Sequence, residues 1–261
     1  MPAFNEGAPC WADVALPDLA AGRAFYGELF GWTFQDQGEE FGHYTMALRD
    51  GAKVAALVPR PDPSMPTAWG VFLAVADVAD TTDKVRAVGG QVAFGPDAVA
   101  DSGVMAGIVD PGGSFVGLWQ PGGHEGFERV AAPGAYAWSE NHTREAEAVD
   151  AFYRDVFGYA SQQVGDGVHL DYRVWSVPGA EDPSLGRLKL GDAPEEDPGY
   201  QVYFAVGDCD DAAATVRRLG GQVLAGPAES PYGRTAVVAD DQGARFAVID
   251  LERRSDGTPG R

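Results

Sequence analysis

The sequence predicts an α+β protein made of four βαβββ modules that are arranged as two pairs. Residues 9–32 return 127 positions later as residues 135–159, and in each copy a strand with a tryptophan precedes an amphipathic helix that ends at glycine. The tetrapeptides AVAD and GGQV of the first half reappear as AVGD and GGQV, 131 positions later. Within each half, the order of a strand, a helix and further strands occurs twice. We therefore infer one module used four times.

The length and composition allow two domains of ordinary size. The chain has 261 residues, of which 45% are hydrophobic and 11% aromatic, enough for two cores. Its net charge of −20 opposes binding to nucleic acid or to an anionic membrane, so neither is expected as a partner. Cys10 and Cys209 have no disulfide or metal-site spacing and are expected to be reduced. The N-terminus lacks the pattern of a signal peptide, which predicts a cytoplasmic protein.

The first module begins with a strand over 10–16. Asp18 is a suitable N-cap for the helix that follows, and Gly31 suits the left-handed position after its end near Phe30. A proline-rich connector over 59–66 ends the module, because proline cannot continue a strand ladder. Between helix and connector lie three extended runs, the last two joined by a tight turn: 32–35, 43–48 and 53–58.

The second module repeats this order. A strand over 69–76 leads to a helix that begins after Asp77 and ends at the glycine pair 89–90. The sequence DPGG is a tight turn between the last two strands of the module. The expected strands are 91–94, 103–109 and 114–120.

The second half follows the same plan after a linker. Glycine and proline are frequent in 122–134, which predicts a linker between a first domain, 1–121, and a second domain, 135–252. The composition of 253–261 predicts a disordered tail. The expected helices are 144–157 and 208–219. The expected strands are 135–141, 169–174, 185–190, 200–206, a strand near Val223, 235–239 and 245–251.

Several motifs carry a resemblance to a known family. With paired βαβββ modules, FYGELFGW after the first helix and DPGGSFVGLW at the end of a half, the chain resembles the vicinal oxygen chelate superfamily. That superfamily includes glyoxalase I, extradiol dioxygenases, fosfomycin-modifying enzymes and bleomycin-binding resistance proteins. PCWADVALPD and APGAYAWSE are similar to its tandem two-domain branch, which is labelled glyoxalase-like or hydroxylase, over nearly the whole chain. The resemblance implies that each pair of modules forms a U-shaped, open barrel.

The resemblance also implies where such proteins hold a divalent metal, namely on the first strand of each module and near each half's end. In this chain those positions are Trp11, Trp138, Gly70, Gln201, Gly117 and Ala247. They supply too few oxygen or nitrogen donors for a hard cation, so we expect no metal and no cofactor. The histidines do not replace the missing donors, because no two have helical i, i+4 spacing. They are His43, His124, His142 and His169.

Aromatic side chains occupy strands that should line the two barrels. Large flat rings bury much area and stack on planar ligands, which makes these residues candidates for binding a small molecule. The alternative is that they fill the core, as strand aromatics commonly do. The candidate ligand-binding residues are Trp11, Trp69, Phe72, Trp119, Trp138, Tyr200 and Tyr203, with Tyr44 and Tyr172 on neighbouring strands.

Polar side chains near the two repeated tryptophans are candidates for acid–base chemistry. Strand alternation places Asp13 on the face of Trp11, and Glu140 and His142 on the face of Trp138. A carboxylate beside aromatic surface or beside a histidine can transfer a proton.

Three hypotheses follow for the function. The first is a metal-free protein that binds a hydrophobic or aromatic small molecule in sequestration, resistance or biosynthesis. The second is a metal-independent isomerase, cyclase or hydroxylation-associated enzyme, and the third, which conflicts with the missing donors, is a metal-dependent lyase or dioxygenase. We expect a monomer and leave a homodimer open.

Overall fold

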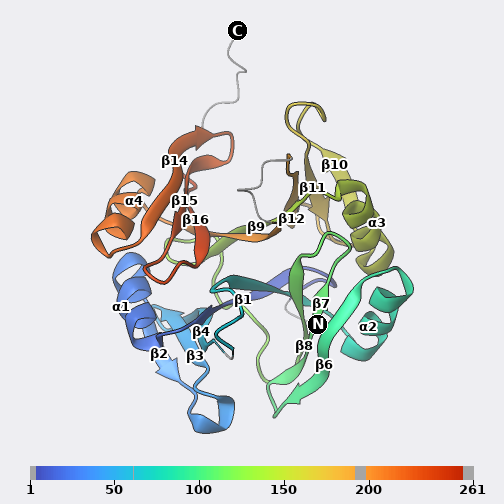
Figure 1. Cartoon of the computed structure of the whole chain (residues 1–261), viewed down its shortest axis with the longest axis horizontal. Coiled ribbons are helices and arrows are strands. Elements are labelled where there is room, and N and C mark those ends of the chain that lie inside the picture. Colours follow the sequence, from blue (N-terminus) through green and yellow to red (C-terminus); the bar gives the residue numbers. More distant parts are fainter. Residues whose placement is uncertain (1–3, 61, 192–197, 255–261) are drawn as a thin grey trace. The chain divides into compact units, whose positions relative to one another are not determined.

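The structure, a computed structural model, describes residues 4–60, 62–191 and 198–254 (Figure 1). Within these residues the chain forms sixteen strands and four α-helices, in the order of four βαβββ modules. The predicted α+β class and the fourfold module are therefore confirmed. Of the predicted tail, residues 255–261 lie outside the described residues.

The first two modules form one eight-stranded sheet, in the strand order β2-β3-β4-β1-β5-β8-β7-β6. The first module contains β1 (Pro9–Leu16), α1 (Leu19–Phe30), β2 (Thr33–Asp36), a 3₁₀ turn (Glu39–Phe41), β3 (Thr45–Arg49) and β4 (Ala52–Pro59). The second contains β5 (Trp69–Ala74), α2 (Val78–Ala87), β6 (Gln91–Val99), β7 (Gly103–Val109) and β8 (Phe115–Pro121). In each module the first strand pairs in parallel with the last, and the other pairs are antiparallel.

The last two modules form the second eight-stranded sheet, in the equivalent order β10-β11-β12-β9-β13-β16-β15-β14. The third module contains β9 (Tyr136–Thr143), α3 (Ala146–Phe157), β10 (Ala160–Gln163), β11 (Tyr172–Ser176) and β12 (Leu185–Lys189). The fourth contains β13 (Gly199–Ala205), α4 (Cys209–Arg218), β14 (Gln222–Ser230), β15 (Gly233–Ala239) and β16 (Arg245–Asp250).

The helix caps agree with the predictions, whereas several strand limits differ. Asp18, Asp77 and Asp208 each accept hydrogen bonds from free N–H groups at the start of α1, α2 and α4. β6 continues past Gly95 to Val99, with irregular pairing to β7, so the predicted end at residue 94 is wrong. Strand β10 was not predicted, because the sequence ASQQ has no apolar alternation and all four residues are exposed.

The start of β11 is also corrected, from residue 169 to Tyr172. Asp166 holds the preceding residues in a loop, because its Oδ1 accepts from the N–H groups of Val168, His169 and Leu170 at 2.8 to 3.0 Å. These N–H groups are then not available to a strand ladder.

By packing, the chain divides into two compact units. The α2/α3 unit comprises Met1–Trp11, Gly70–Gly126 and Trp138–Gln201, and the α1/α4 unit comprises Ala12–Trp69, Phe127–Ala137 and Val202–Arg261. Within each unit the two helices that name it lie beside one another (Figure 1). Each unit thus combines one module of the first half with one of the second, while the predicted limits of the two halves stay a prediction.

The core of the α1/α4 unit is a cluster of aromatic rings around Tyr26 of α1. Its ring lies 5.5 Å from that of Trp69 and 5.7 Å from that of Phe246, measured between centroids. Phe204 contacts Phe30 and Trp69 with centroids 5.2 and 4.7 Å apart. Residues of the first module therefore pack directly on β13 and β16 of the fourth.

A buried hydrogen bond fixes the same two modules to one another. The Tyr26 hydroxyl donates to Asp240 Oδ2 at 2.8 Å and accepts from Trp69 Nε1 at 3.1 Å. Asp240 also closes the turn after β15, because its Oδ1 accepts from the N–H groups of Gln242 and Ala244. Burial raises the pKa of the Asp240 carboxyl, and these donors oppose that rise.

The α2/α3 unit contains the equivalent arrangement. The Tyr153 hydroxyl of α3 donates to Asp110 Oδ2 at 3.3 Å, and Asn141 Nδ2 donates to the same oxygen at 2.8 Å. The Tyr200 hydroxyl donates to that of Tyr153 at 2.8 Å. Tyr200 thus takes the place that Trp69 has in the other unit, and the repeat visible in the sequence extends to these buried contacts.

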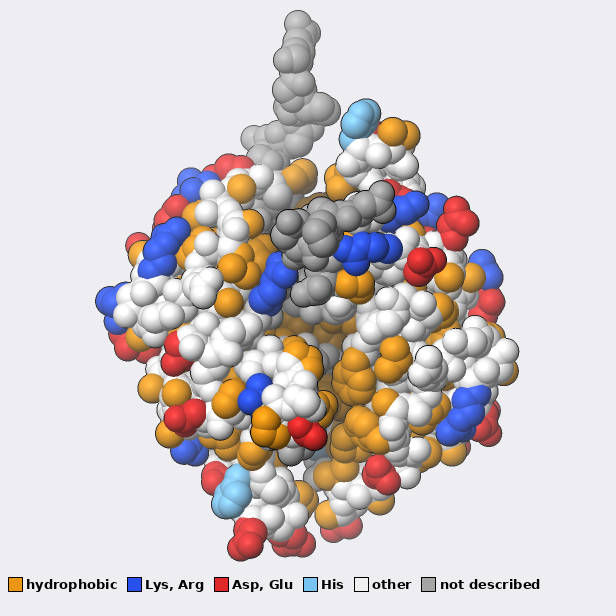
Figure 2. All heavy atoms as spheres, viewed as in Figure 1, with side chains coloured by type: hydrophobic (Ala, Val, Ile, Leu, Met, Phe, Trp, Pro, Cys, Tyr) orange, Lys and Arg blue, Asp and Glu red, His pale blue; other side chains and the backbone are white. Residues whose placement is uncertain are grey.

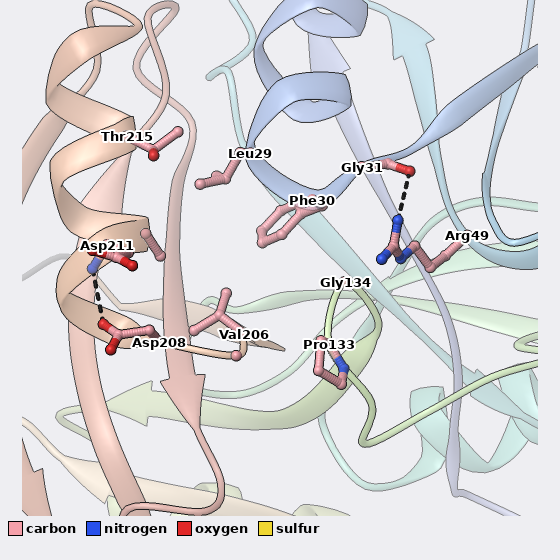
Figure 3. Close-up of a pocket in the computed structure, with 12 residues that line it drawn as sticks. Leu29, Phe30, Gly31, Arg49, Pro133, Gly134, Val206, Asp208, Asp211 and Thr215 are labelled. Atoms are coloured by element: carbon pink, nitrogen blue, oxygen red, sulfur yellow. Dashed lines mark hydrogen bonds between the residues drawn. The ribbon is translucent and has the colours of Figure 1, made fainter.

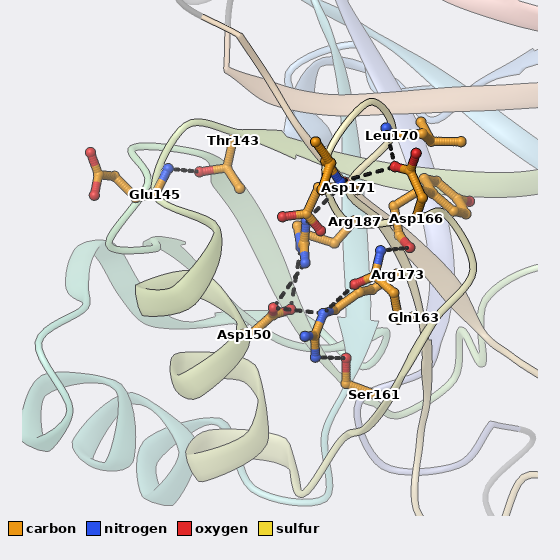
Figure 4. Close-up of polar contacts among 12 residues, drawn as sticks. Thr143, Glu145, Asp150, Ser161, Gln163, Asp166, Leu170, Asp171, Arg173 and Arg187 are labelled. Atoms are coloured by element: carbon orange, nitrogen blue, oxygen red, sulfur yellow. Dashed lines mark hydrogen bonds and ion pairs between the residues drawn. The ribbon is translucent and has the colours of Figure 1, made fainter.

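Helix α3 is also held by an ion cluster around Arg187 of β12 (Figure 4). Its guanidinium, only 1% exposed, contacts Asp150 Oδ2 at 3.0 Å and Asp171 Oδ1 at 2.9 Å. Trp175 Nε1 donates to Asp150 Oδ1 at 2.9 Å. The buried positive charge is therefore paired with two carboxylates, as its burial requires.

On the molecular face drawn in Figure 2, acidic and basic side chains are interspersed among apolar ones. Both cysteines are free and buried. In the part of the chain that the structure describes, no helix has the length and apolarity that crossing a bilayer requires.

Candidate functional site

Strand β9 presents three partly exposed side chains on one face. Trp138, Glu140 and His142 alternate with Ser139 and Asn141, which are fully buried on the opposite face. The alternation predicted from the sequence is thus present, and the three candidate side chains lie on one side of the second sheet.

A neighbouring tyrosine joins these side chains into one hydrogen-bonded network. The Tyr172 hydroxyl donates to Glu140 Oε1 at 2.8 Å and accepts from Trp138 Nε1 at 3.2 Å. The other carboxylate oxygen, Oε2, lies 3.2 Å from His142 Nε2. We call Trp138, Glu140, His142 and Tyr172 the Glu140 network. The side chains of Glu140 and His142 are 13% and 21% exposed, so the network can be reached from solvent.

A glycine makes room for this contact. Tyr172 lies on β11 and Glu140 on β9, and β12 runs between them, with Gly186 beside Glu140. A Cβ at Gly186 would lie 2.3 Å from the Tyr172 hydroxyl oxygen and 3.1 Å from Glu140 Cγ. As it crosses β12, the phenol occupies the space that a side chain at position 186 would fill.

The arrangement of the Glu140 network suits both binding and proton transfer. Trp138 and Tyr172 offer flat surfaces with polar edges, while the Glu140 carboxylate and the His142 imidazole are within hydrogen-bond distance of one another. The sequence indicated all four members as candidates. It did not indicate that the Tyr172 hydroxyl joins Trp138 to Glu140, because that contact depends on strand register.

The first sheet contains a smaller version of the network, in the α1/α4 unit. The Tyr44 hydroxyl donates to Asp13 Oδ2 at 3.2 Å. Burial raises the pKa of the Asp13 carboxyl to about 7, and the hydrogen bond from Tyr44 only partly opposes this rise. Asp13 and Tyr44 stand at the repeat positions of Glu140 and Tyr172, whereas Ala15 stands in place of His142.

Other predicted ligand-binding residues lie in well-packed surroundings. Trp69 is 5% exposed within the aromatic core, and Tyr200 donates to the core residue Tyr153. Trp11 is 3% exposed and contacts the ring of His124 edge-on, with centroids 4.5 Å apart. Trp119 Nε1 donates to the His124 carbonyl at 2.8 Å. Their role in ligand binding stays a prediction.

Phe72 and Tyr203 complete the predicted set. The ring of Phe72 covers Gly117, since a Cβ at Gly117 would lie 2.2 Å from Phe72 Cδ1. Tyr203 of β13 is partly exposed and lies opposite Ala247 of β16. Ligand binding by these two residues likewise stays a prediction.

A cavity of about 470 Å³ lies elsewhere, in the α1/α4 unit (Figure 3). The end of α1 and the start of α4 form its walls, with Leu29, Phe30 and Val206 among its apolar residues and Arg49 and Asp211 among its polar ones. None of the predicted site residues lines it. No motif indicated this cavity, because it depends on how two helix ends and the loop at Gly134 pack.

The positions at which the fold would place a metal do not fit one. A hard divalent cation needs several converging oxygen or nitrogen donors. Trp138 has no lone-pair donor for a cation, and Gly117 and Ala247 have no donor atoms in their side chains. Across residues 4–60, 62–191 and 198–254, no three His, Cys, Asp or Glu side chains gather closely enough to hold a metal ion. We therefore derive no chemistry through a metal.

Comparison with family models assigns both halves of the chain. Residues 11–118 match the model described as Glyoxalase/Bleomycin resistance protein/Dioxygenase superfamily, and residues 140–249 match that of the Glyoxalase-like domain. Solved structures share the fold at low identity. The Mn(II)-bound glyoxalase from Novosphingobium aromaticivorans has a TM-score of 0.65 and 17% identity, over 97% of this chain and 87% of that one. The 2,3-dioxygenase LapB from Pseudomonas sp. KL28 has a TM-score of 0.65 and 14% identity, over 95% and 93%.

Relatives of higher identity span almost the whole chain. CFP32 of Mycobacterium bovis, provisionally named a glyoxylase, is 38% identical over 94% of this chain and 95% of its own. The anthracycline biosynthesis protein DnrV of Streptomyces peucetius is 37% identical over 96% of each chain. DauV of Streptomyces sp. strain C5, also named an anthracycline biosynthesis protein, is 36% identical over the same shares.

Proposed function

Because the chain belongs to the Glyoxalase/Bleomycin resistance protein/Dioxygenase superfamily, we propose that it binds an aromatic small molecule of natural-product metabolism beside the Glu140 network. The observation that carries this proposal is the hydrogen-bonded run from Trp138 through Tyr172 and Glu140 to His142. It combines aromatic surface with a few fixed polar atoms, as small-molecule sites commonly do.

The electrostatics and the relatives support the same class of ligand. Within the network, the indole N–H and the phenol O–H are directed at one another and at Glu140, and the indole and phenol rings are flat surfaces of the kind that stack on planar ligands. DauV and DnrV are named for the biosynthesis of anthracyclines. A planar, hydroxylated aromatic molecule therefore suits the site, held by stacking and by hydrogen bonds to Glu140 or His142.

Binding can be tested with 1,4-dihydroxyanthraquinone as the probe. Calorimetric titration of the intact protein should give saturable binding, and Trp138→Ala should weaken it tenfold to a hundredfold, about 1 to 3 kcal/mol, because a stacking surface is lost. Tyr172→Phe should weaken it less, since the ring remains. Tyr232→Phe is the matched control, because Tyr232 is an exposed tyrosine outside the network. Equal affinity of the wild type and Trp138→Ala would contradict the proposal.

A second candidate function is metal-independent proton transfer, which the 3.2 Å contact between Glu140 and His142 favours. A carboxylate can take a proton from the bound molecule while the imidazole returns one to another atom. NMR in D₂O can follow deuterium incorporation into a C–H of a bound hydroxyketone. Glu140→Gln and His142→Gln should abolish this exchange and retain binding if the protein is an enzyme, whereas a binding protein shows no exchange in any variant.

A further inference from the structure

The first sheet carries a contact that the proposed function does not use. Tyr44 of β3 reaches across β4 to Asp13 of β1, with the hydroxyl 3.2 Å from Oδ2. Ala56 lies between them in the register, opposite both Asp13 and Met46. Asp13 and Tyr44 are both partly exposed as residues, while the Asp13 carboxyl itself lies deep enough for burial to dominate its pKa, so a ligand would meet the pair at the bottom of this sheet face.

Beside this pair, the first sheet has apolar residues at a position where the second sheet has a polar one. Ala15 follows Asp13 on the same face of β1 and lies opposite Val58, and both are partly exposed. His142 is the repeat counterpart of Ala15. No Lys, Arg or His side chain of the described residues forms an ion pair with Asp13, whereas Glu140 contacts His142. The first sheet therefore offers a carboxyl group in apolar surroundings without a basic partner.

A carboxyl in apolar surroundings can act as a neutral acid. Burial raises its pKa to about 7, so a large share of the molecules carries the neutral acid at neutral pH. A neutral carboxyl can donate its O–H, and the phenol beside it can donate or accept a hydrogen bond. A carbonyl oxygen can accept from the neutral carboxyl while the phenol keeps its hydrogen bond to Oδ2, and the neighbouring Ala15, Met46 and Val58 offer apolar surface.

We propose that Asp13 and Tyr44 form a second ligand site, which takes an uncharged, largely apolar ketone through its carbonyl oxygen. This inference rests on the proposed function only in treating the sheet faces as binding surfaces. It assigns the two sheets different tasks: the second binds a hydroxylated aromatic beside an acid–base pair, and the first binds a neutral carbonyl compound. An anionic ligand would be repelled by the ionised share of the Asp13 carboxyl, with which no Lys, Arg or His of the described residues forms an ion pair.

The test uses 9-fluorenone as the probe and fluorene, which lacks the carbonyl oxygen, as the matched ligand. The intact protein is labelled at the methionine methyl groups, and the signal of Met46 is assigned with Met46→Leu. Fluorenone should shift the Met46 methyl resonance in a saturable manner, and fluorene should bind at least tenfold more weakly. Asp13→Ala should weaken the binding of fluorenone at least tenfold and leave the binding of fluorene unchanged. The affinity of Tyr44→Phe for fluorenone should lie between those of the wild type and Asp13→Ala.

Asp13→Asn keeps a hydrogen-bond donor of similar shape and should retain fluorenone within about threefold, which separates loss of the donor from loss of the fold. Equal binding of fluorenone and fluorene, or equal binding of fluorenone to the wild type and Asp13→Ala, would overturn the proposal. If 2-(aminomethyl)fluorene, a cation at neutral pH, bound more tightly than fluorenone, the proposal of a ketone site would be wrong and the pair would be an amine site. Trp138→Ala should leave the fluorenone shift intact, so this outcome is independent of the test on the Glu140 network.

Discussion

A single residue, Asp13, decides how the carboxyl–tyrosine contact of the first sheet responds to pH. The pKa of Asp13 rises from its ordinary value of 3.8 to about 7 because burial disfavours the charged form. The folded protein therefore retains this proton over a pH range in which the unfolded chain releases it. The contribution of Asp13 to stability is full below about pH 4, falls as the pH rises toward 7, and is constant above that.

Asp13→Asn removes this titration, so the stability of the variant relative to the wild type should increase between pH 4.5 and pH 7.5. Urea unfolding midpoints at several pH values measure the difference directly. Asp97→Asn serves as the control for replacing an aspartate by asparagine, because Asp97 is exposed on β6. A pH-independent difference for Asp13→Asn would show that the Asp13 carboxyl titrates normally.

For single residues, the sequence indicated the two acids and the pair of Glu140 with His142, but not the contacts of the acids with tyrosine. Strand alternation is a local property, so Trp138, Glu140 and His142 could be placed on one face from the sequence alone. The hydroxyl groups of Tyr44 and Tyr172 reach their carboxylates across an intervening strand. That contact depends on the register of three strands, which a single sequence does not specify.

Among the elements, helix α3 depends on a buried charge for its attachment to the second sheet. Asp150 on α3 accepts from the buried Arg187 and from Trp175 (Figure 4). Asp150→Ala leaves the guanidinium, 1% exposed, with a single carboxylate, and should lower the free energy of unfolding by about 3 to 5 kcal/mol. Thermal or urea unfolding gives this value.

Asp155→Ala is the matched control on the same helix. Asp155 pairs with Arg154 on the exposed surface, and the two side chains are 45% and 62% exposed. Such a pair contributes little, so the change should alter stability by no more than about 0.5 kcal/mol. If the two variants lost stability equally, the Arg187 cluster would not be what holds α3.

Prediction of elements succeeded where local chemistry determines them. Asp18, Asp77 and Asp208 cap their helices because a short carboxylate before an apolar repeat satisfies the free N–H groups. β10 was not predicted, because its sequence has no pattern of alternating apolar residues. It is a strand because it pairs with β11. The charged cluster of Arg187 was likewise not foreseen, since its partners come from α3 and from the loop before β11.

For the whole molecule, the aromatic core of the α1/α4 unit joins distant parts of the chain. Tyr26 and Phe30 pack on Phe204 and Phe246, and Tyr26 donates to Asp240. Residues 1–134 and 135–261, expressed separately, should therefore fail to fold cooperatively, because each exposes half of this core. Co-expression should restore folding, as measured by circular dichroism and thermal melting.

The control tests whether a break in the chain is itself destabilising. An engineered protease site in the exposed loop at 181–182 allows the folded protein to be cleaved there after it has formed. The cleaved protein should melt close to the intact chain. Cooperative folding of residues 1–134 alone, at the melting temperature of the intact protein, would mean that the contacts with Phe204, Phe246 and Asp240 are dispensable.

The glycine at position 186 and the alanine at position 56 give the two copies of the module different space beneath the tyrosine. The second sheet combines Glu140 with Gly186, and the first combines the shorter Asp13 with Ala56, one methyl larger. A methyl group added to Gly186 while Glu140 and Tyr172 keep their places would collide with the phenol. Position 186 can therefore take a methyl group only if the Tyr172 phenol moves. In the first sheet, where Ala56 carries that methyl group, the tyrosine still contacts an acid that is one methylene shorter.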